Sequence, residues 1–552
     1  MQIPVSELIV RYMERLGIEY AFGMPGAHVL PVYDALYQSP IRTVLAKHEQ
    51  GASFMAGGYA RIAHRPAACI ATAGPGATNL VTGIANAYAE QLPVLAVTGE
   101  TSTYIFGRGG LQESSGEGGA IDQAELFRSI TRYRKLIERT DYLGQVLNQA
   151  TQALSGPQPG PVLLSIPYNV QKEPVDTDVL DQVHFPRRDT GSGAALTPVA
   201  ELACLIEQAS NPVIIAGYGC IKAGARGMVA NLAEGLGIPV ATSLKGKGVV
   251  TEGSDISLGC LGVTSDGAAR QYIVEQADLV LFLGAGFNER TSYLWSDELL
   301  DGKKIAQVDR DAAQIGRVFR PDLAIQGDIH QVLGELLEQV QARGITPKQP
   351  VPVTAGEDPA AAAEDAAASP FRLVETFFRV LAERFPRDAI VVDDNIVFGQ
   401  RYFQVSADNH YLPNSGISSL GHAIPAAIGA RLFAPDSPTF AILGDGGFQM
   451  CCMEIMTAVN YQVPLNVVVI NNGTMGLIRK NQFQLYGERY IDCDFVNPDF
   501  AALAQAFGVR HYRVDDEDAI ETLFAQADLH GSINLIELPL DRQAFPTYLS
   551  AR

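Results

Sequence analysis

The sequence predicts an α/β protein of three doubly wound parallel-sheet domains, and three observations support this prediction. Short apolar runs recur along the chain, and such runs are typical of strands that are buried on both faces. Many of the runs end in glycine-containing turns, and segments with helical patterning follow the turns. The length of 552 residues and the hydrophobic content of 47% are enough for roughly three domain cores.

The first predicted domain covers residues 1–172. A helical pattern opens it at residues 5–16, and a helix rich in small residues runs through Arg61. The apolar runs that predict its strands lie at residues 20–23, 43–46, 67–72, 94–98 and 162–166. We expect a parallel sheet, because repeated strand, turn and helix segments build such sheets.

The second predicted domain covers residues 190–342. Two apolar runs, at 212–216 and 279–283, each lead into a glycine turn. Such turns can bind dinucleotides, but neither has the GxGxxG spacing, so tight turns in a structural Rossmann-like domain explain them equally well.

Residues 346–370 are rich in Pro, Ala, Glu and Asp and have little hydrophobic patterning, which predicts a solvated linker. The third predicted domain follows at 371–552 and ends in an apolar run at 534–539. No internal repeat is evident, although the first and third domains are compatible with one shared topology.

The composition excludes several classes of function. With 41 Lys and Arg against 61 Asp and Glu, the net charge of −20 would repel nucleic acid. We find no apolar run of membrane-spanning length and no signal sequence at the amino terminus. Seven dispersed cysteines without a CxxC pair argue for reduced thiols in the cytoplasm, rather than for disulfides or a zinc site.

The most informative stretch runs from residue 444 to residue 472. Gly444, Asp445, Gly446 and Gly447 follow the apolar run at 440–443, where a strand would give way to a helix. Ligands of open α/β sheets bind at such strand ends, glycines let backbone approach a phosphate, and a carboxylate can bind a divalent cation. Asn472 ends the next apolar run and offers a second oxygen ligand.

This pair of markers, GDG followed by NN, resembles the diphosphate-Mg²⁺ motif of thiamine-diphosphate enzymes. The resemblance implies thiamine diphosphate and Mg²⁺ as cofactors, with the backbone carbonyl of Thr474 as a third protein ligand of the metal. It also implies that Leu420 lies beneath the folded cofactor and that Ser418 offers its carbonyl to the pyrimidine amino group. From its chemistry alone, Leu420 is equally well explained as a core leucine.

The segment Lys47-His48-Glu49-Gln50-Gly51-Ala52 resembles a motif of acetolactate synthases and their relatives. By this resemblance, the Glu49 carboxyl shares a proton with the cofactor pyrimidine and so activates the cofactor. Taken alone, a Glu before a glycine is more commonly an exposed helix start. Further segments extend the resemblance to the acetolactate synthase branch over nearly the whole chain: 22–27, 29–36, 73–79, 111–113 and 425–430.

Several residues bear on the substrate. In that branch Gln112 lies near the reacting carbonyl, and Arg290 matches an Arg that meets the acceptor acid. Asn481 stands where acetolactate synthases carry a substrate-selecting Trp. His28 follows Gly26 and Ala27 as in benzaldehyde lyase, and a histidine there can relay protons. Together, His28, Gln112 and Asn481 are also similar to cyclohexane-1,2-dione hydrolase.

The central domain binds FAD in that branch, but residues 261–265 lack the usual histidine, so FAD, ADP and no nucleotide all stay open. We expect an enzyme that makes or breaks a carbon-carbon bond beside a carbonyl, with decarboxylation of a 2-oxo acid such as pyruvate and carboligation. The alternatives are an acyloin or cyclic-diketone lyase or hydrolase, and a catalytically silent binding paralogue. Because Glu49 and Asp445 lie in different domains, and relatives place the cofactor between subunits, we expect a homodimer or homotetramer.

Overall fold

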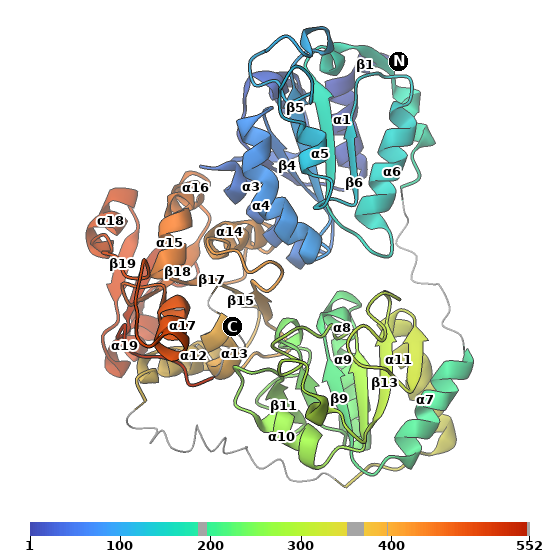
Figure 1. Ribbon diagram of the computed structural model, residues 1–552, viewed down its shortest axis with the longest axis vertical. Helices are drawn as coiled ribbons and strands as arrows, with labels where there is room; N and C mark the ends of the chain where they lie inside the picture. The colour runs from blue at the N-terminus through green and yellow to red at the C-terminus, as the bar shows by residue number, and fades with distance from the viewer. Residues whose placement is uncertain (186–195, 350–368, 395, 549–552) are drawn as a thin grey trace.

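The computed structural model describes residues 1–185, 196–349, 369–394 and 396–548. It contains three domains, each built on a six-stranded, wholly parallel sheet with helices packed against it (Figure 1). The predicted fold class is confirmed.

The sheet of the first domain has the strand order β3-β2-β4-β5-β7-β6. All residues of β4 and β5 are buried, which explains why these strands are apolar without alternation. Helices α3 (Glu49–Ala63) and α4 (Pro75–Ala89) pack on one face, and α1 (Val5–Arg15) and α6 (Leu143–Ser155) pack on the other. The strands are β2 (Tyr20–Gly23), β3 (Arg42–Leu45), β4 (Ala67–Ala71), β5 (Val94–Glu100), β6 (Tyr133–Leu136) and β7 (Val162–Pro167).

Chain segments beyond residue 172 still pack on this domain. Strand β8 (Pro174–Asp176) pairs antiparallel with β1 (Gln2–Pro4). Leu180, in η4 (Thr177–Gln182), belongs to the same hydrophobic cluster as α1 and α6. The packing of the first domain therefore continues past the end predicted for it.

The central sheet has the order β11-β10-β9-β12-β13-β14. Counted along the domain this is 3-2-1-4-5-6, the order of dinucleotide-binding doubly wound sheets. A Cβ atom at Gly217 would collide with the carbonyl of Gly284, so the two predicted glycine turns pack directly on one another. The strands are β9 (Pro212–Ala216), β10 (Val240–Thr242), β11 (Ser257–Cys260), β12 (Leu279–Leu283), β13 (Lys304–Asp309) and β14 (Leu323–Gln326).

The third sheet has the order β16-β15-β17-β18-β20-β19. Counted along each domain, the first and third sheets share the order 2-1-3-4-6-5, a common topology that the sequence allowed without showing a repeat. The strands are β15 (Ile390–Asp393), β16 (His410–Pro413), β17 (Thr439–Gly444), β18 (Leu465–Asn471), β19 (Arg510–Arg513) and β20 (Ile533–Pro539).

The first and third domains share one hydrophobic core. Helix α14 (Ala423–Phe433) of the third domain lies against α3 of the first (Figure 1). Two glycines permit this close approach: a Cβ at Gly58 would collide with the carbonyl of Ala426, and one at Gly429 with the carbonyl of Met55. The two domains are therefore held in a fixed relation by backbone contact.

The predicted linker at 346–370 lies mostly outside the described residues, because 350–368 are not among them. Within the described ranges, no helix combines the length and the apolar character needed to cross a membrane.

Candidate active site

The carboxyl ends of β17 and β18 bring the two parts of the GDG and NN markers together. These strands are parallel neighbours, with Gly444 in register with Ile470. Helix α15 (Asp445–Cys451) starts directly after β17, and α17 (Gly476–Tyr486) follows the turn after β18. Asp445 and Asn472 therefore meet at one edge of the sheet, as the sequence predicted.

Asp445 is a buried carboxylate held by donors from both strand ends. Its Oδ2 accepts hydrogen bonds from the backbone N–H of Asn472 (3.0 Å) and Gly473 (2.6 Å) and from Nδ2 of Asn497 (2.7 Å). Burial raises the pKa of Asp445, and these hydrogen bonds oppose that shift. No Lys or Arg forms an ion pair with it in the described parts of the chain. A bound cation would neutralise this charge.

The oxygen atoms around Asp445 fit a hard divalent cation. Oδ1 of Asn472 accepts only a weak hydrogen bond from the Thr474 N–H (3.2 Å), and the Thr474 hydroxyl donates to the Cys493 carbonyl (2.9 Å). Asp445 and Asn472 thus present one carboxylate and one amide group at this strand edge, and oxygens of both kinds are ligands that Mg²⁺ takes in proteins. Among the described residues no group of three or more His, Cys, Asp or Glu is placed to hold a metal ion.

Asn497 holds this arrangement and was not found from the sequence. Its Nδ2 also donates to Oδ1 of Asn471 (2.8 Å), and its own Oδ1 accepts from Gln449 of α15 (2.8 Å). It therefore connects both markers. A lone Asn so far from GDG and NN carries no spacing signal.

Ser418 and Leu420 lie in the loop between β16 and α14. Ser418 has a left-handed backbone (φ 54°), a conformation that costs energy for a non-glycine residue. A Cβ at Gly447 would lie 3.9 Å from the Leu420 Cβ, so Leu420 lies beside the start of α15. Asp394, a second residue missed by sequence reasoning, holds the loop by accepting from the N–H groups of His422 (2.9 Å) and Ala423 (3.1 Å).

Glu49 is the first residue of α3 and is half-buried. Its Oε2 accepts a hydrogen bond from Nδ2 of Asn79 (2.9 Å). A Cβ at Gly76 would lie 3.4 Å from its Oε1, so the glycine turn at the start of α4 faces this carboxylate. The carboxylate is thus oriented by the neighbouring helix.

The structure brings His28 and Gln112 together near the same turn. Nδ1 of His28 lies 3.2 Å from Oε1 of Gln112, and the Thr72 hydroxyl donates to the same oxygen (3.2 Å). Gln112 has a left-handed backbone (φ 56°), and a Cβ at Gly74 would lie 3.3 Å from its Cβ. Burial lowers the pKa of His28, although its hydrogen bond with Gln112 opposes the shift. Burial therefore favours the neutral form of the His28 ring.

Within one chain, Glu49 and Ser418 lie at opposite ends of α4. Glu49 faces Gly76 at its start, whereas a Cβ at Gly416 would lie 2.8 Å from Oε1 of Glu90, just past its end. The 15 residues of α4 span roughly 22 Å, and Ser418 is within about 7 Å of Gly416. Within one chain, Glu49 and the loop that carries Ser418 therefore approach different ends of α4.

Arg290 and Lys480 are two cationic side chains close enough to interact electrostatically. Nη1 of Arg290, in the loop after β12, is buried and has no hydrogen-bond partner in the described chain. The same holds for Nζ of Lys480 on α17, which lies 3.6 Å from the ring centroid of Tyr548. Burial, followed by the charge of Arg290, lowers the pKa of Lys480 to about 8. Asn481, the next residue, is half-exposed.

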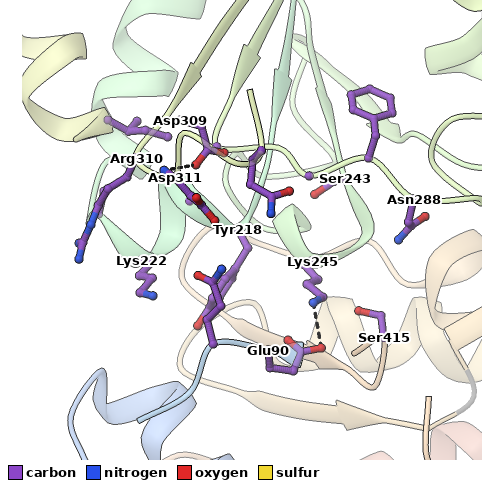
Figure 2. Close-up of a pocket in the computed structure, with 18 of the residues that line it drawn as sticks. Glu90, Tyr218, Lys222, Ser243, Lys245, Asn288, Asp309, Arg310, Asp311 and Ser415 are labelled. Carbon is purple, nitrogen blue, oxygen red and sulfur yellow. Dashed lines mark hydrogen bonds and ion pairs between the residues drawn. The ribbon is translucent and has the colours of Figure 1, made fainter. Parts of the chain in front are cut away.

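A cavity of about 350 Å³ opens at the carboxyl edge of the central sheet (Figure 2). The central domain contributes both glycine turns and the charged side chains of Lys222 and Asp309, while Glu90 and Ser415 come from the first and third domains. Lys245 and Glu90 form an ion pair of 2.9 Å at its wall. Its glycine turns and its mixture of cationic and acidic groups suit a nucleotide.

Comparison with known proteins agrees with this geometry. Three family models match: the N-terminal TPP binding domain of thiamine pyrophosphate enzymes over residues 3–125, their central domain over 199–336, and their C-terminal TPP binding domain over 395–538. The chain is similar to a probable acetolactate synthase large subunit of Methanocaldococcus jannaschii, with 32% identity over 97% of this chain and 92% of the relative. Similar relatives are an acetolactate synthase of Mycobacterium bovis (32%, covering 95% and 86%) and an acetolactate synthase large subunit of Lactococcus lactis (31%, covering 93% and 88%). The chain therefore belongs to the thiamine pyrophosphate enzymes, in the branch that contains the acetolactate synthases.

Proposed function

We propose that this enzyme decarboxylates a 2-oxo acid such as pyruvate and joins the remaining two-carbon unit to a carbonyl acceptor. The observation that carries the proposal is the buried Asp445 carboxylate, which has no cationic partner among the described residues and lies beside Asn472, combined with Glu49 at a helix start in another domain. Relatives that share nearly the whole chain length are named acetolactate synthases.

Asp445, Asn472 and the Thr474 carbonyl would hold Mg²⁺, and the turn formed by Gly444, Gly446 and Gly447 would take the diphosphate. When bound, thiamine diphosphate supplies a carbon nucleophile that attacks a carbonyl and then accepts the electron pair released by bond cleavage. Residues of the protein control the protons and the geometry.

Glu49 would hold a proton at the pyrimidine ring, and Leu420 would keep the two cofactor rings together. Neutral His28 can accept a proton from the substrate oxygen, and the Nε2 group of Gln112 can donate a hydrogen bond to that oxygen.

The unpartnered cations favour a substrate that carries a carboxylate. Nη1 of Arg290 and Nζ of Lys480 are buried without a hydrogen-bond acceptor in the described chain, and a carboxylate between them would offset the cost of that burial. Asn481 replaces the bulky Trp of acetolactate synthases, which leaves room for an acceptor larger than pyruvate or for a polar one.

The second candidate is cleavage of an acyloin or a cyclic diketone without decarboxylation. The pairing of His28 with Gln112 supports it, because a base and an amide can serve hydroxyl and ketone groups equally. A silent binding paralogue is disfavoured, since Glu49, Asp445 and Asn472 are all present.

Incubation of the holoenzyme with pyruvate, ThDP and Mg²⁺ tests the first candidate. We expect release of CO₂ and a ligated product, and we expect Glu49→Gln to abolish both. Turnover of an acyloin or cyclic diketone with no CO₂ from any 2-oxo acid would select the second candidate. Full activity of Glu49→Gln would reject both mechanisms.

We also propose that the cavity of the central domain holds a nucleotide. Its volume is at the lower end of the range for ligand sites, which favours ADP over FAD. An absorption spectrum of the purified protein decides between them, because only FAD absorbs near 450 nm.

The opposite placement of Glu49 and Ser418 along α4 supports a homodimer or homotetramer in which each chain supplies Glu49 to its partner's cofactor. Exposed apolar side chains next to both halves of the site support the same proposal: Leu111, Ile417, Met450, Leu477 and Ile478. We expect an isolated monomer to be inactive, and we place the enzyme in the cytoplasm. Activity of a monomer that does not depend on concentration would contradict this assembly.

A further inference from the structure

Glu454 is a buried acidic residue of the third domain that contacts the turn before Glu49. It lies in η7 (Cys452–Glu454), which directly continues α15, and it is 3% exposed. Its Oε1 accepts hydrogen bonds from the backbone N–H of Lys47 (3.1 Å) and of His48 (3.1 Å), and its Oε2 lies 3.2 Å from the Lys47 N. The Thr457 hydroxyl donates to Oε2 (2.6 Å). Every partner is a donor, so the carboxylate is used fully as an acceptor.

Gly51 of α3 also lies close to the Glu454 carboxylate. A Cβ at this position would collide with Oε1 of Glu454. The glycine in the motif around Glu49 therefore makes room for the carboxylate of another domain. Gly57, in the same helix, has only an ordinary contact, with a Cβ 3.7 Å from Leu92.

A second residue of the third domain strengthens this contact. The hydroxyl of Tyr461 accepts from the N–H of Leu45 (2.7 Å), at the end of β3. Leu45, Lys47 and His48 all precede Glu49, and the third domain therefore accepts from three backbone donors along the approach to it. No backbone carbonyl of the first domain has to supply these acceptors.

From these contacts we propose that Glu454 is a positioning residue: it fixes the backbone from which the Glu49 carboxylate reaches the cofactor pyrimidine. This inference rests on the proposed role of Glu49. It also links the two ends of the cofactor site, because Glu454 ends the helical segment that Asp445 begins. Asn79 orients the Glu49 carboxylate, whereas Glu454 sets the position of its main chain.

The test compares Glu454→Gln and Gly51→Ala with Gly57→Ala as the matched control. Glu454→Gln keeps the shape but replaces one acceptor oxygen by a donor that faces backbone N–H groups. Gly51→Ala leaves every charge in place and displaces the Glu454 carboxylate by collision.

In the apoenzyme, amide hydrogen exchange of residues 45–50, followed by mass spectrometry, should accelerate on the order of tenfold in both variants and stay unchanged in Gly57→Ala. This readout needs no cofactor. Unchanged exchange in Glu454→Gln and Gly51→Ala would overturn the inference.

In the holoenzyme, deuterium incorporation at the thiazolium C2 should slow by about 100-fold at saturating ThDP and Mg²⁺, since a displacement near 1 Å costs that much. The ThDP dissociation constant should stay within about threefold, because the diphosphate ligands are unaltered. A lower melting temperature with a normal C2 exchange rate would show a merely structural role and overturn the proposal. A wild-type enzyme that exchanges C2 but does not convert pyruvate would reject the proposed substrate alone.

Discussion

At the scale of single residues, the candidate site contains a buried carboxylate, Asp445, that is held by hydrogen bonds and not by an ion pair among the described residues. Asp445 is 1% exposed and lacks a cationic partner in the described chain, yet four N–H groups converge on it. A buried charge held only by dipoles is costly, which is understandable where a metal completes the site.

Replacement of Asp445 by Asn should therefore weaken cofactor binding far more than it weakens the fold. We expect the ThDP affinity in the presence of Mg²⁺ to fall by at least about 100-fold, because even partners of metal ligands contribute 10- to 100-fold. Titration calorimetry measures this loss. Asn497→Ala removes a hydrogen-bond donor to Asp445 and should lower the ThDP affinity less, by about 10- to 100-fold. Equal affinities for the wild type and Asp445→Asn would place the diphosphate elsewhere.

His28 should make stability depend on pH in a defined direction. Burial lowers its pKa in the folded state, so the unfolded chain binds the proton more readily. Its contribution to stability is then full above the unfolded value of about 6.5 and is lost as the pH falls toward the lower folded pKa. Denaturant titrations from pH 7.5 to 5.5 should show a steeper loss of the free energy of unfolding in wild type than in His28→Gln. Parallel curves would mean that the folded pKa is not lowered.

At the scale of elements, the packing of α3 on α14 determines where Glu49 and the loop of Leu420 lie. Both helices are rich in small residues, and at Gly58 and Gly429 the backbone of one helix contacts the backbone of the other. Such contacts cannot relax by a change of rotamer. The position of both site segments thus depends on the absence of a Cβ atom at Gly58 and Gly429.

Gly429→Ala should consequently destabilise the protein, by about 1–3 kcal/mol or more, as overpacking does when the obstacle is backbone. Gly235→Ala, in α9 (Arg226–Leu236), is the control, because a Cβ there meets nothing within 4 Å. That control should stabilise by roughly 0.4–1 kcal/mol through the unfolded state. Guanidinium titrations of both variants provide the comparison, and an unchanged midpoint for Gly429→Ala would mean that the two helices separate freely.

The elements themselves were largely predictable, whereas several of their polar contacts were not. The apolar runs at β4, β5, β17 and β18 predict buried strands, since a strand of a parallel sheet is covered on both faces and is therefore mostly apolar. Asn497 and Glu454 carry no comparable signal. Each acts on a segment that is remote in sequence, and only the folded chain brings them to Asp445 and Glu49.

At the scale of the whole molecule, the arrangement of domains 1 and 3 decides how many chains make one site. The contacts along α4 separate Glu49 from Ser418 within a chain, although the sequence places both in motifs of the same cofactor site. The motifs predict the site residues but not their relative positions. A closed dimer with twofold symmetry would exchange the two Glu49 residues and complete both sites at once.

Mixing two inactive variants tests this assembly directly. In a mixed dimer of Glu49→Gln and Asp445→Ala chains, one site receives Glu49 from the second chain and the metal ligands from the first, and it is intact. Its counterpart carries both defects. Random pairing makes half of the dimers mixed, each with one of two sites active, so refolding the two variants together should restore about a quarter of wild-type activity. Refolding wild type with the double variant should do the opposite, because each site of the mixed dimer then has one defect and the mixed dimers are silent. If each chain formed its own site, the mixture of Glu49→Gln with Asp445→Ala would stay inactive. In the mixture of wild type with the double variant, each mixed dimer would then keep one active site of its two.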